Sequence, residues 1–253
     1  MNTQPIFHFF NKLFLTGIAF TCLLRADPWH PEITHRPRTL YLAEDVDAIR
    51  GRLGSEPYHS IWANSLGSYH SIYVSARRNI AASTNTQSNP RAYFDKRSWV
   101  AKDAAFVYAM NRQADGITDL DENSDEGDNL WTREEYFSQA VNYLETLSPD
   151  VIGPTGIIDL ETHGPMINNW QYRVHELIDY CQAYDLLLGA GMPANSTIEN
   201  KLASFANNLL NKYTATEYTN QYLLQRNNHK LTMGAALGMA GIVLNHHQDA
   251  SDW

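Results

Sequence analysis

The chain has 253 residues, of which 43% are hydrophobic and 19% charged, and its formal charge is −9 at pH 7. This length suits one large domain with a sizeable core, or two small ones. The acidic balance argues against a nucleic-acid-binding protein, because such proteins gain affinity by neutralising phosphates with Lys and Arg. If the partner is a polyanion, the cations that meet it must be gathered locally.

The first 26 residues have the pattern of an export signal. Lys12 precedes the apolar run 13–24, which is too short to cross a bilayer permanently, and Ala26 provides a small residue before a cleavage point. Residues 1–26 are therefore predicted to be a signal peptide, and the mature protein is predicted to be periplasmic or secreted. Lipid anchoring at Cys22 is the alternative. No later apolar segment is long enough for a stable membrane span.

Residues 27–43 are predicted to form a linker rich in Pro and His, and residues 44–253 to form a helical domain. Apolar side chains recur at helical spacing throughout this domain. The segments 132–135 (Thr-Arg-Glu-Glu) and 196–199 (Ser-Thr-Ile-Glu) are capping boxes, which mark two helix starts. The expected helices cover residues 44–53, 58–82, 98–110, 132–147, 169–188, 196–213 and, starting at Asn228 or His229, the segment to 244.

No convincing strand pattern accompanies these helices, so the predicted class is all-α. In the last helix Leu231, Ala235, Gly238 and Ile242 form one apolar or small stripe, and the other side is apolar as well. A helix of this kind is expected to be buried between neighbours. The alternation of half-exposed and buried helices predicts stacked antiparallel helical hairpins in an (α/α) toroid. Seven helices are too few to close it, so the toroid is expected to be incomplete.

Two segments that contain several potential metal ligands do not fit the usual metal sites. In the acidic insertion 115–129, a calcium-loop alignment that starts at Asp121 puts Glu126 where glycine is needed and Thr132 where a bidentate Glu is needed. The segment 246–249 (His-His-Gln-Asp) lacks further ligands. A solvated loop and a polar helix end are the simpler interpretations, and no metal or other cofactor is predicted.

The segment 159–173 is dense in groups that bind sugar hydroxyls and carboxylates. Aromatic side chains in it could stack on pyranose faces, and Asp159 and Glu161 could form the acid–base pair of a glycoside hydrolase. The alternative is a polar loop in which Asn168 or Asn169 caps the next helix. The candidate substrate-binding residues of this segment are His163, Asn169, Trp170, Gln171 and Arg173.

The most informative polar segment is 226–230, at the start of the last helix. It places two amides, an imidazole and two cations beside the unpaired backbone N–H groups of a helix N-terminus, which favour an anion. This mixture suits a site that neutralises a substrate carboxylate. Alternatively, Asn227 or Asn228 simply caps the helix, and the two roles could coexist. The candidate residues are Arg226, Asn227, Asn228, His229 and Lys230.

Five segments of the chain follow one another in a familiar order. They are 35–45 (His-Arg-Pro-Arg-Thr-Leu-Tyr-Leu-Ala-Glu-Asp), 49–53, 104–110, 183–187 and 227–229, of which the last, Asn-Asn-His, is the most specific. In this order the chain resembles the heparinase II/III-like enzymes and related alginate lyases, over roughly residues 35–247. The resemblance implies an N-terminal (α/α) toroid that belongs to a polysaccharide lyase, which cleaves uronic-acid polymers by β-elimination.

The resemblance also implies roles for two residues. Asn228 would bind the substrate carboxylate, and His229 would assist it or act as the base toward one C5 epimer. Removing the C5 proton of a uronate puts a second negative charge beside the carboxylate, so donors aimed at that group stabilise the transition state. Arg226 and Lys230 would hold neighbouring acidic sugars. The implied partner is an acidic polysaccharide such as alginate or a glycosaminoglycan.

The chain departs from this family after the Asn-His pair. The catalytic tyrosine and the β-sandwich of such lyases lie further along, whereas no tyrosine follows His229 here. The chain is therefore expected to be the N-terminal part of a lyase, either a fragment or a truncated product, whose missing C-terminal part supplies the rest of the active site. The alternatives are a carbohydrate-binding helical protein without chemistry and an (α/α)-barrel glycoside hydrolase.

Overall fold

The computed structural model describes residues 35–53, 55–58, 72–78, 90–110, 131–149, 167–214 and 228–253. For residues 73–74, 90–96, 167–172, 212–214 and 228–230 it describes the backbone alone. The chain divides into one unit of residues 1–32 and a second of residues 33–253, and all described residues belong to the second. The predicted signal peptide lies outside the described residues.

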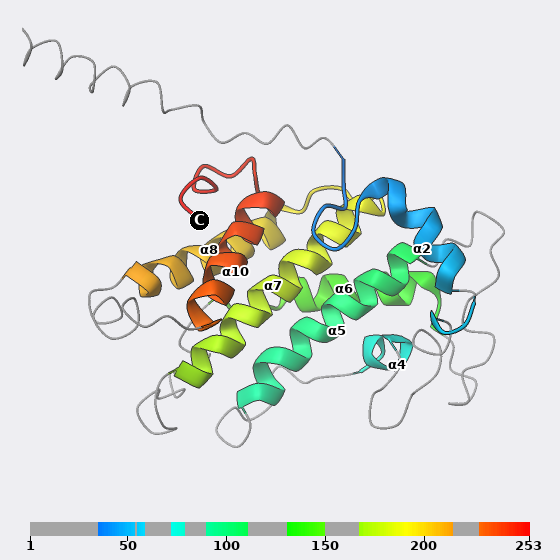
Figure 1. Cartoon of the computed structure of the whole chain (residues 1–253), viewed down its shortest axis with the longest axis horizontal. Helices are drawn as coiled ribbons and strands as arrows, with labels where there is room; N and C mark the ends of the chain where they lie inside the picture. Colours follow the sequence, from blue (N-terminus) through cyan, green and yellow to red (C-terminus); the bar gives the residue numbers. More distant parts are fainter. Residues whose placement is uncertain are drawn as a thin grey trace, which may run out of the picture. The chain divides into compact units, whose positions relative to one another are not determined.

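The described residues are helical and contain no strand, which confirms the predicted all-α class (Figure 1). A short 3-10 helix, η1, leads into α2. None of the described helices is long and apolar enough to cross a membrane. The elements are η1 (Ala43–Asp45), α2 (Val46–Leu53), α4 (Ile72–Ala76), α5 (Pro90–Met110), α6 (Arg133–Glu145), α7 (Ile167–Gly189), α8 (Ser196–Thr214) and α10 (Asn228–Val243).

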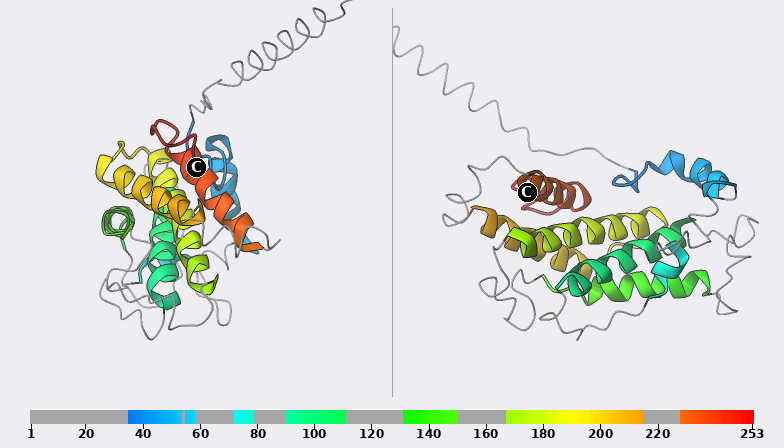
Figure 2. Two further views of the ribbon diagram at one scale, coloured as in Figure 1. Left: turned by 90° about the vertical axis from the view of Figure 1, so that its left-hand side faces the viewer. Right: turned by 60° about the horizontal axis from the view of Figure 1, so that its bottom comes forward.

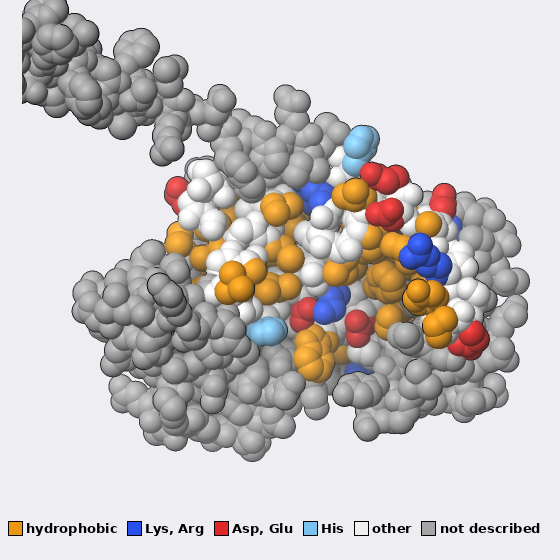
Figure 3. All heavy atoms as spheres, in the orientation of Figure 1, with side chains coloured by type: hydrophobic (Ala, Val, Ile, Leu, Met, Phe, Trp, Pro, Cys, Tyr) orange, Lys and Arg blue, Asp and Glu red, His pale blue; other side chains and the backbone are white. Residues whose placement is uncertain are grey.

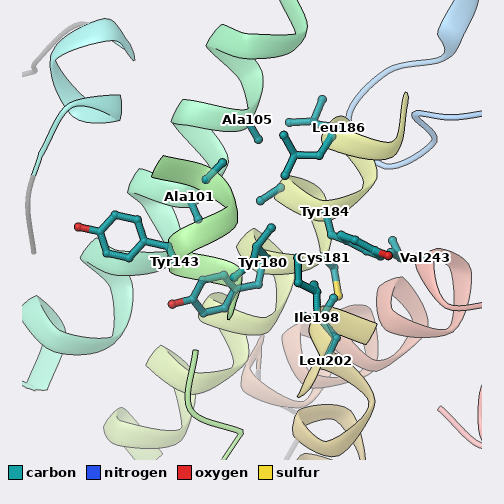
Figure 4. Close-up of a cluster of buried hydrophobic side chains, with 14 of the residues drawn as sticks. Ala101, Ala105, Tyr143, Tyr180, Cys181, Tyr184, Leu186, Ile198, Leu202 and Val243 are labelled. Atoms are coloured by element: carbon teal, nitrogen blue, oxygen red, sulfur yellow. The ribbon is translucent and has the colours of Figure 1, made fainter. Parts of the chain in front are cut away.

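Helix α7 is the centre of the helical packing, because it contacts α5, α6, α8 and α10 (Figures 1 and 2). Its side chains Tyr180, Cys181 and Tyr184 are fully buried among residues of the neighbouring helices (Figure 4). On α5, the short side chains of Ala101 and Ala105 are also fully buried, and they allow α5 and α7 to approach closely. The toroid of hairpins stays a prediction.

The two predicted capping boxes have different outcomes. In α6 the box is present: the Thr132 hydroxyl accepts a hydrogen bond from the Glu135 N–H at 3.3 Å, and the Glu135 carboxylate accepts one from the Thr132 N–H at 2.6 Å. In α8 the predicted box is wrong, because Asn195 caps the helix through its Oδ1, at 3.0 Å from the Thr197 N–H. The Glu199 carboxylate instead accepts a hydrogen bond from the Tyr184 hydroxyl at 2.9 Å.

A buried aspartate of α7 holds part of the predicted linker against the helices. The Asp185 side chain is 0% exposed and accepts hydrogen bonds from Arg36 Nη1 at 3.1 Å, from the Arg38 N–H at 2.6 Å, and from both the N–H and the hydroxyl of Thr39 at 2.9 and 3.0 Å. A buried carboxylate is stable only when its charge and lone pairs are satisfied in this way. Residues 36–39 are therefore bound to the helical unit.

Helix α10 differs from the expectation of burial on nearly all sides. Met233, Leu237 and Ala240 are buried, but Leu231 is 77% exposed and Ala235 is exposed as well. Helix α10 contacts α7 and α8, while Gly238 and Ile242 of the same stripe are half-buried. The composition of a helix indicates which faces are able to pack, and the neighbours present decide which of them do.

A polar layer joins α5 to α4 and α7. On α7, the Asp179 carboxylate forms an ion pair with Lys102 Nζ and accepts a hydrogen bond from Ser98 Oγ at 3.2 Å. Asp103, the neighbour of Lys102, hydrogen-bonds to Ser75 of α4. Burial raises the pKa of Asp103 to about 6, an effect that the Ser75 hydrogen bond and the Lys102 charge partly offset. Burial also raises the pKa of Asp179, and Lys102 partly offsets this shift.

Replacing Asp103 with Asn is expected to stabilise the protein above pH 6. In the unfolded chain this carboxyl ionises near its ordinary pKa of 3.8, whereas in the folded protein it keeps its proton up to about pH 6. The folded state thus binds more protons between these values, so the free energy of unfolding falls as the pH rises from about 4 to 6, by about 3 kcal/mol.

Urea unfolding between pH 4 and 8 measures this effect. We expect the slope to be much shallower in Asp103→Asn than in the original chain, and to be unchanged in Asp252→Asn, which alters an exposed acid near the C-terminus. The groups that face Asp103 are Ser75, Arg78, Lys102 and Asp179. Because the pKa of Asp179 is raised too, part of the slope is expected to remain. Equal slopes in all three proteins would contradict the assignment to Asp103.

Candidate substrate site at the first turns of α7 and α10

Helix α10 begins at Asn228, as predicted, so Asn228, His229 and Lys230 form its first turn. The N–H groups of a first helical turn lack partners within the helix, and the helix dipole adds a partial positive charge there. The backbone of this turn therefore favours an anion whatever the side chains do. The side chains of these three residues, and Arg226 and Asn227 altogether, lie outside the described residues.

Helix α7 begins at Ile167, two residues earlier than predicted. Neither Asn168 nor Asn169 therefore occupies the capping position that one alternative assigned to them. The candidate residues Asn169, Trp170 and Gln171 are carried instead on the first turns of a long helix, where the backbone fixes their spacing. Their side chains lie outside the described residues, as do His163 and the proposed acid pair Asp159 and Glu161.

The first turns of α7 and α10 lie at the same end of this helix pair. The Arg36 guanidinium joins the opposite ends, because it contacts Asp185 at 3.1 Å and the carbonyl of Val243, the last residue of α10, at 2.7 Å. Helix rise gives about 24 Å from Asp185 back to Asn169 and about 23 Å from Val243 back to Asn228. Since the two helices pack together and run the same way in Figure 1, the candidate residues of both are at one end.

This arrangement can bind an anion. Two helix N-termini at one end of a pair add their partial positive charges, and the first turn of α10 brings Lys230 to the same place. Amide and imidazole groups on these turns are suited to hydrogen-bonding a carboxylate or sugar hydroxyls. An acidic sugar therefore matches the backbone electrostatics better than a neutral or cationic ligand.

Arg173, the remaining candidate, is engaged within the protein. It is 2% exposed, its guanidinium pairs with Glu176 and donates to the Ser148 carbonyl at 2.6 Å, and it lies over the Phe205 ring at 4.3 Å. These contacts hold α7 to α8 and to the segment that follows α6. Direct contact with a substrate would require Arg173 to leave these partners.

The polar residues after α10 are used to fold the C-terminal segment back onto α8. His246 Nε2 lies 3.3 Å from the Glu199 carboxylate, and the His247 ring stacks on Trp253. Trp253 Nε1 donates a hydrogen bond to Oδ1 of Asn207 in α8 at 2.7 Å. Among the residues that the structure describes, no group of His, Cys, Asp and Glu is placed to hold a metal ion.

Comparison of the sequence with protein-family models and with curated proteins gives no match.

Proposed function

We propose that this chain is the uronate-binding helical part of a polysaccharide lyase, built as an incomplete (α/α) toroid, which acts on an acidic polymer such as alginate or a glycosaminoglycan. The observation that carries the proposal is the placement of the first turns of α7 and α10 at one end of the helix pair. The predicted export of the chain would place it where such polymers occur.

In this proposal, the first turn of α10 stabilises the charge that develops during β-elimination. Asn228 donates to the carboxylate of the uronate, and the helix N-terminus lowers the energy of the dianion formed when the C5 proton leaves. His229 either supports Asn228 or takes the proton from one C5 epimer. Arg226 and Lys230 bind the acidic sugars on either side.

The catalytic acid of the reaction is assigned to no residue of this chain. Lyases of the resembled family use a tyrosine that lies beyond the Asn-His pair, and no tyrosine follows His229 in this sequence. We propose that the first turn of α10 contributes substrate binding and neutralisation of the substrate carboxylate. Weak turnover by His229 alone is the activity expected of the isolated chain.

An absorbance assay tests this proposal. β-Elimination creates an unsaturated sugar that absorbs in the ultraviolet, so incubation with alginate and glycosaminoglycans is expected to give a slow rise in absorbance. Removing one preorganised donor to a developing anion costs about 10²–10³ in rate, so Asn228→Ala and His229→Ala are expected to abolish the rise. Trp170→Ala is expected to have a smaller effect, because stacking on a sugar face assists binding only.

Leu231→Ala is the matched control, because Leu231 lies two residues after His229 in the same helix and is 77% exposed. It is expected to keep the activity of the original chain. A release of reducing ends without absorbance would instead indicate a glycoside hydrolase, and binding without any product would indicate a carbohydrate-binding protein. Equal, small losses in Asn228→Ala, His229→Ala and Trp170→Ala would contradict the assignment of the site.

A further inference from the structure

A second polar surface lies over the contact between α5 and α7, in the middle of both helices. It consists of Trp99, Lys102 and Asp103 of α5 together with His175 and Asp179 of α7. Trp99 is 37% exposed, the Lys102 side chain 27%, and His175 is exposed, so these groups are accessible from outside. Figure 3 shows basic, acidic and histidine side chains gathered next to hydrophobic ones over these helices.

The spacing of these residues places them on facing stripes of the two helices. Trp99, Lys102 and Asp103 are separated by three and four residues, and so are on one side of α5. His175 and Asp179 are four residues apart on α7. The ion pair between Lys102 and Asp179 shows that the two stripes meet. His175 lies close enough to Asp179 to interact with it electrostatically.

An ion pair that served only to join the helices would explain Lys102 and Asp179 alone. It would not require a large aromatic side chain to remain exposed on the same side of α5, or a second carboxyl group at Asp103. Burial raises the pKa of both carboxyl groups, so each is held in a partly desolvated position at the edge of an accessible surface. Such positions are frequent at binding and catalytic sites.

The chemistry of this surface matches a pyranose sugar. The face of an indole ring offers a flat apolar surface to the C–H face of a sugar ring. Carboxylates accept hydrogen bonds from sugar hydroxyls, and ammonium and imidazole groups donate to sugar oxygens. An apolar platform with a few convergent polar groups is also the usual composition of a small-ligand site.

The charge of the surface favours an uncharged sugar. In a formal count that takes His as neutral, Asp103 and Asp179 contribute two negative charges and Lys102 contributes one positive charge. A uronate carboxylate here would meet a net negative surface and lose affinity. This preference is opposite to that of the first turns of α7 and α10, where the helix N-termini favour an anion.

We propose that the surface formed by Trp99, Lys102, Asp103, His175 and Asp179 binds an uncharged pyranose residue of an oligosaccharide. Trp99 is the stacking platform, Asp103 accepts hydrogen bonds from the sugar hydroxyls, and Lys102 and His175 donate to the ring and hydroxyl oxygens. The buried Asp179 holds Lys102 in place through their ion pair. The site is independent of the proposed lyase chemistry, because it shares no residue with the first turns of α7 and α10.

Isothermal titration calorimetry with hexasaccharides tests this proposal. The probes are the neutral cellohexaose, mannohexaose and N-acetylchitohexaose, with hexamannuronate as the charged comparison. We expect at least one neutral probe to bind, and Trp99→Ala to weaken that binding about tenfold, the usual effect of removing an aromatic anchor. Asp103→Asn is expected to weaken it several-fold, even though it stabilises the fold at the same pH.

Two control variants show whether the binding belongs to this surface. Tyr58→Ala removes an aromatic side chain that is 46% exposed elsewhere, and it is expected to leave the affinity unchanged. Asn228→Ala is also expected to leave the affinity for the neutral probe unchanged, which separates failure of this site from failure of the lyase proposal. A lack of binding by every neutral probe, tighter binding of hexamannuronate at this surface, or unchanged affinity in both Trp99→Ala and Asp103→Asn would overturn the proposal.

Discussion

Replacing Asp185 with Asn is expected to lower the free energy of unfolding by about 3–5 kcal/mol, the usual loss when one partner of a buried ion pair is removed. The Asp185 side chain is 0% exposed and accepts hydrogen bonds from Arg36, Arg38 and Thr39. Asparagine keeps one oxygen but turns the other acceptor into a donor. The new NH2 group would then face other donors, either the N–H groups of residues 38 and 39 or the Arg36 guanidinium.

Urea unfolding of Asp185→Asn measures this loss, and Asp47→Asn is the matched control. Asp47 also faces an arginine, at 3.9 Å from Arg50 Nη1, but its side chain is 91% exposed. Water already solvates an exposed pair of this kind, so the control is expected to change the free energy of unfolding by less than about 1 kcal/mol. A similar, small change in both variants would show that residues 36–39 are not held by Asp185.

Replacing Gly189 with Ala is expected to destabilise the protein by about 1–3 kcal/mol, because the added methyl group would overpack a closed contact. A Cβ atom at Gly189 would lie 2.4 Å from Pro37 Cδ, 2.5 Å from Pro37 N and 2.9 Å from the carbonyl carbon of Arg36. Two of these three atoms belong to the backbone, so a change of side-chain rotamer cannot relieve the clash. The segment before η1 would have to move away from the end of α7.

Gly234→Ala is the control for Gly189→Ala, since Gly234 is also helical and nothing lies within 4 Å of a Cβ built there. Alanine is the better helix former, so this control is expected to stabilise the protein by up to about 1 kcal/mol. Calorimetric melting temperatures of the two variants are therefore expected to move in opposite directions. If Gly189→Ala raised the melting temperature as well, the close packing of Pro37 on α7 would be wrong.

Asp185→Asn and Gly189→Ala both act on the contact between the segment before η1 and the C-terminal end of α7. Residues 35–45 and 183–187 are far apart in sequence, yet Arg36, Arg38 and Thr39 of the first meet Asp185 of the second. Arg36 and Arg38 also donate to the carbonyls of Val243 and Ile242 at the end of α10. These cations satisfy carbonyl groups that a helix end leaves without partners.

Local patterns allowed some of the fold to be predicted from the sequence. The capping box at Thr132 and Glu135 depends on residues three apart, and the structure contains it. The start of α10 at Asn228 follows from a polar segment that precedes a long apolar one. The box predicted at residue 196 is wrong because Asn195 is an equally good capping residue one position earlier, and Glu199 bonds to Tyr184 instead.

Contacts between distant segments could not be predicted in this way. The helical spacing placed Asp185 among apolar positions, and a buried acid implies a cationic partner, but nothing local identifies Arg36, which is 149 residues away. The beginning of α5 at Pro90 was missed because the charged residues Arg91, Asp95, Lys96 and Arg97 interrupt the apolar pattern of its first two turns. Burial of both faces of α10 was expected from composition, but burial depends on neighbours as well as on the helix itself.

The candidate site was likewise only partly predictable from the sequence. The polar residues at the starts of α7 and α10 are visible in the sequence, whereas their placement at one end of the helix pair depends on the contact of Arg36 with Val243, across 207 residues. The surface around Trp99 was missed because the pattern of α5 was interpreted only through its apolar positions. A useful signal was the spacing of Trp99, Lys102 and Asp103, which are three and four residues apart and so lie on one side of the helix.

Two-dimensional ¹H–¹⁵N spectra recorded during a titration with hexamannuronate test the central claim most directly. We expect the backbone amide signals of Asn228, His229 and Lys230 to shift and saturate, together with those of Asn169 and Gln171, because the uronate carboxylate would lie against both helix starts. A neutral hexasaccharide is expected to leave these signals unchanged. If hexamannuronate shifted none of them, or shifted only signals distant from the first turns of α7 and α10, the proposed uronate site would be wrong.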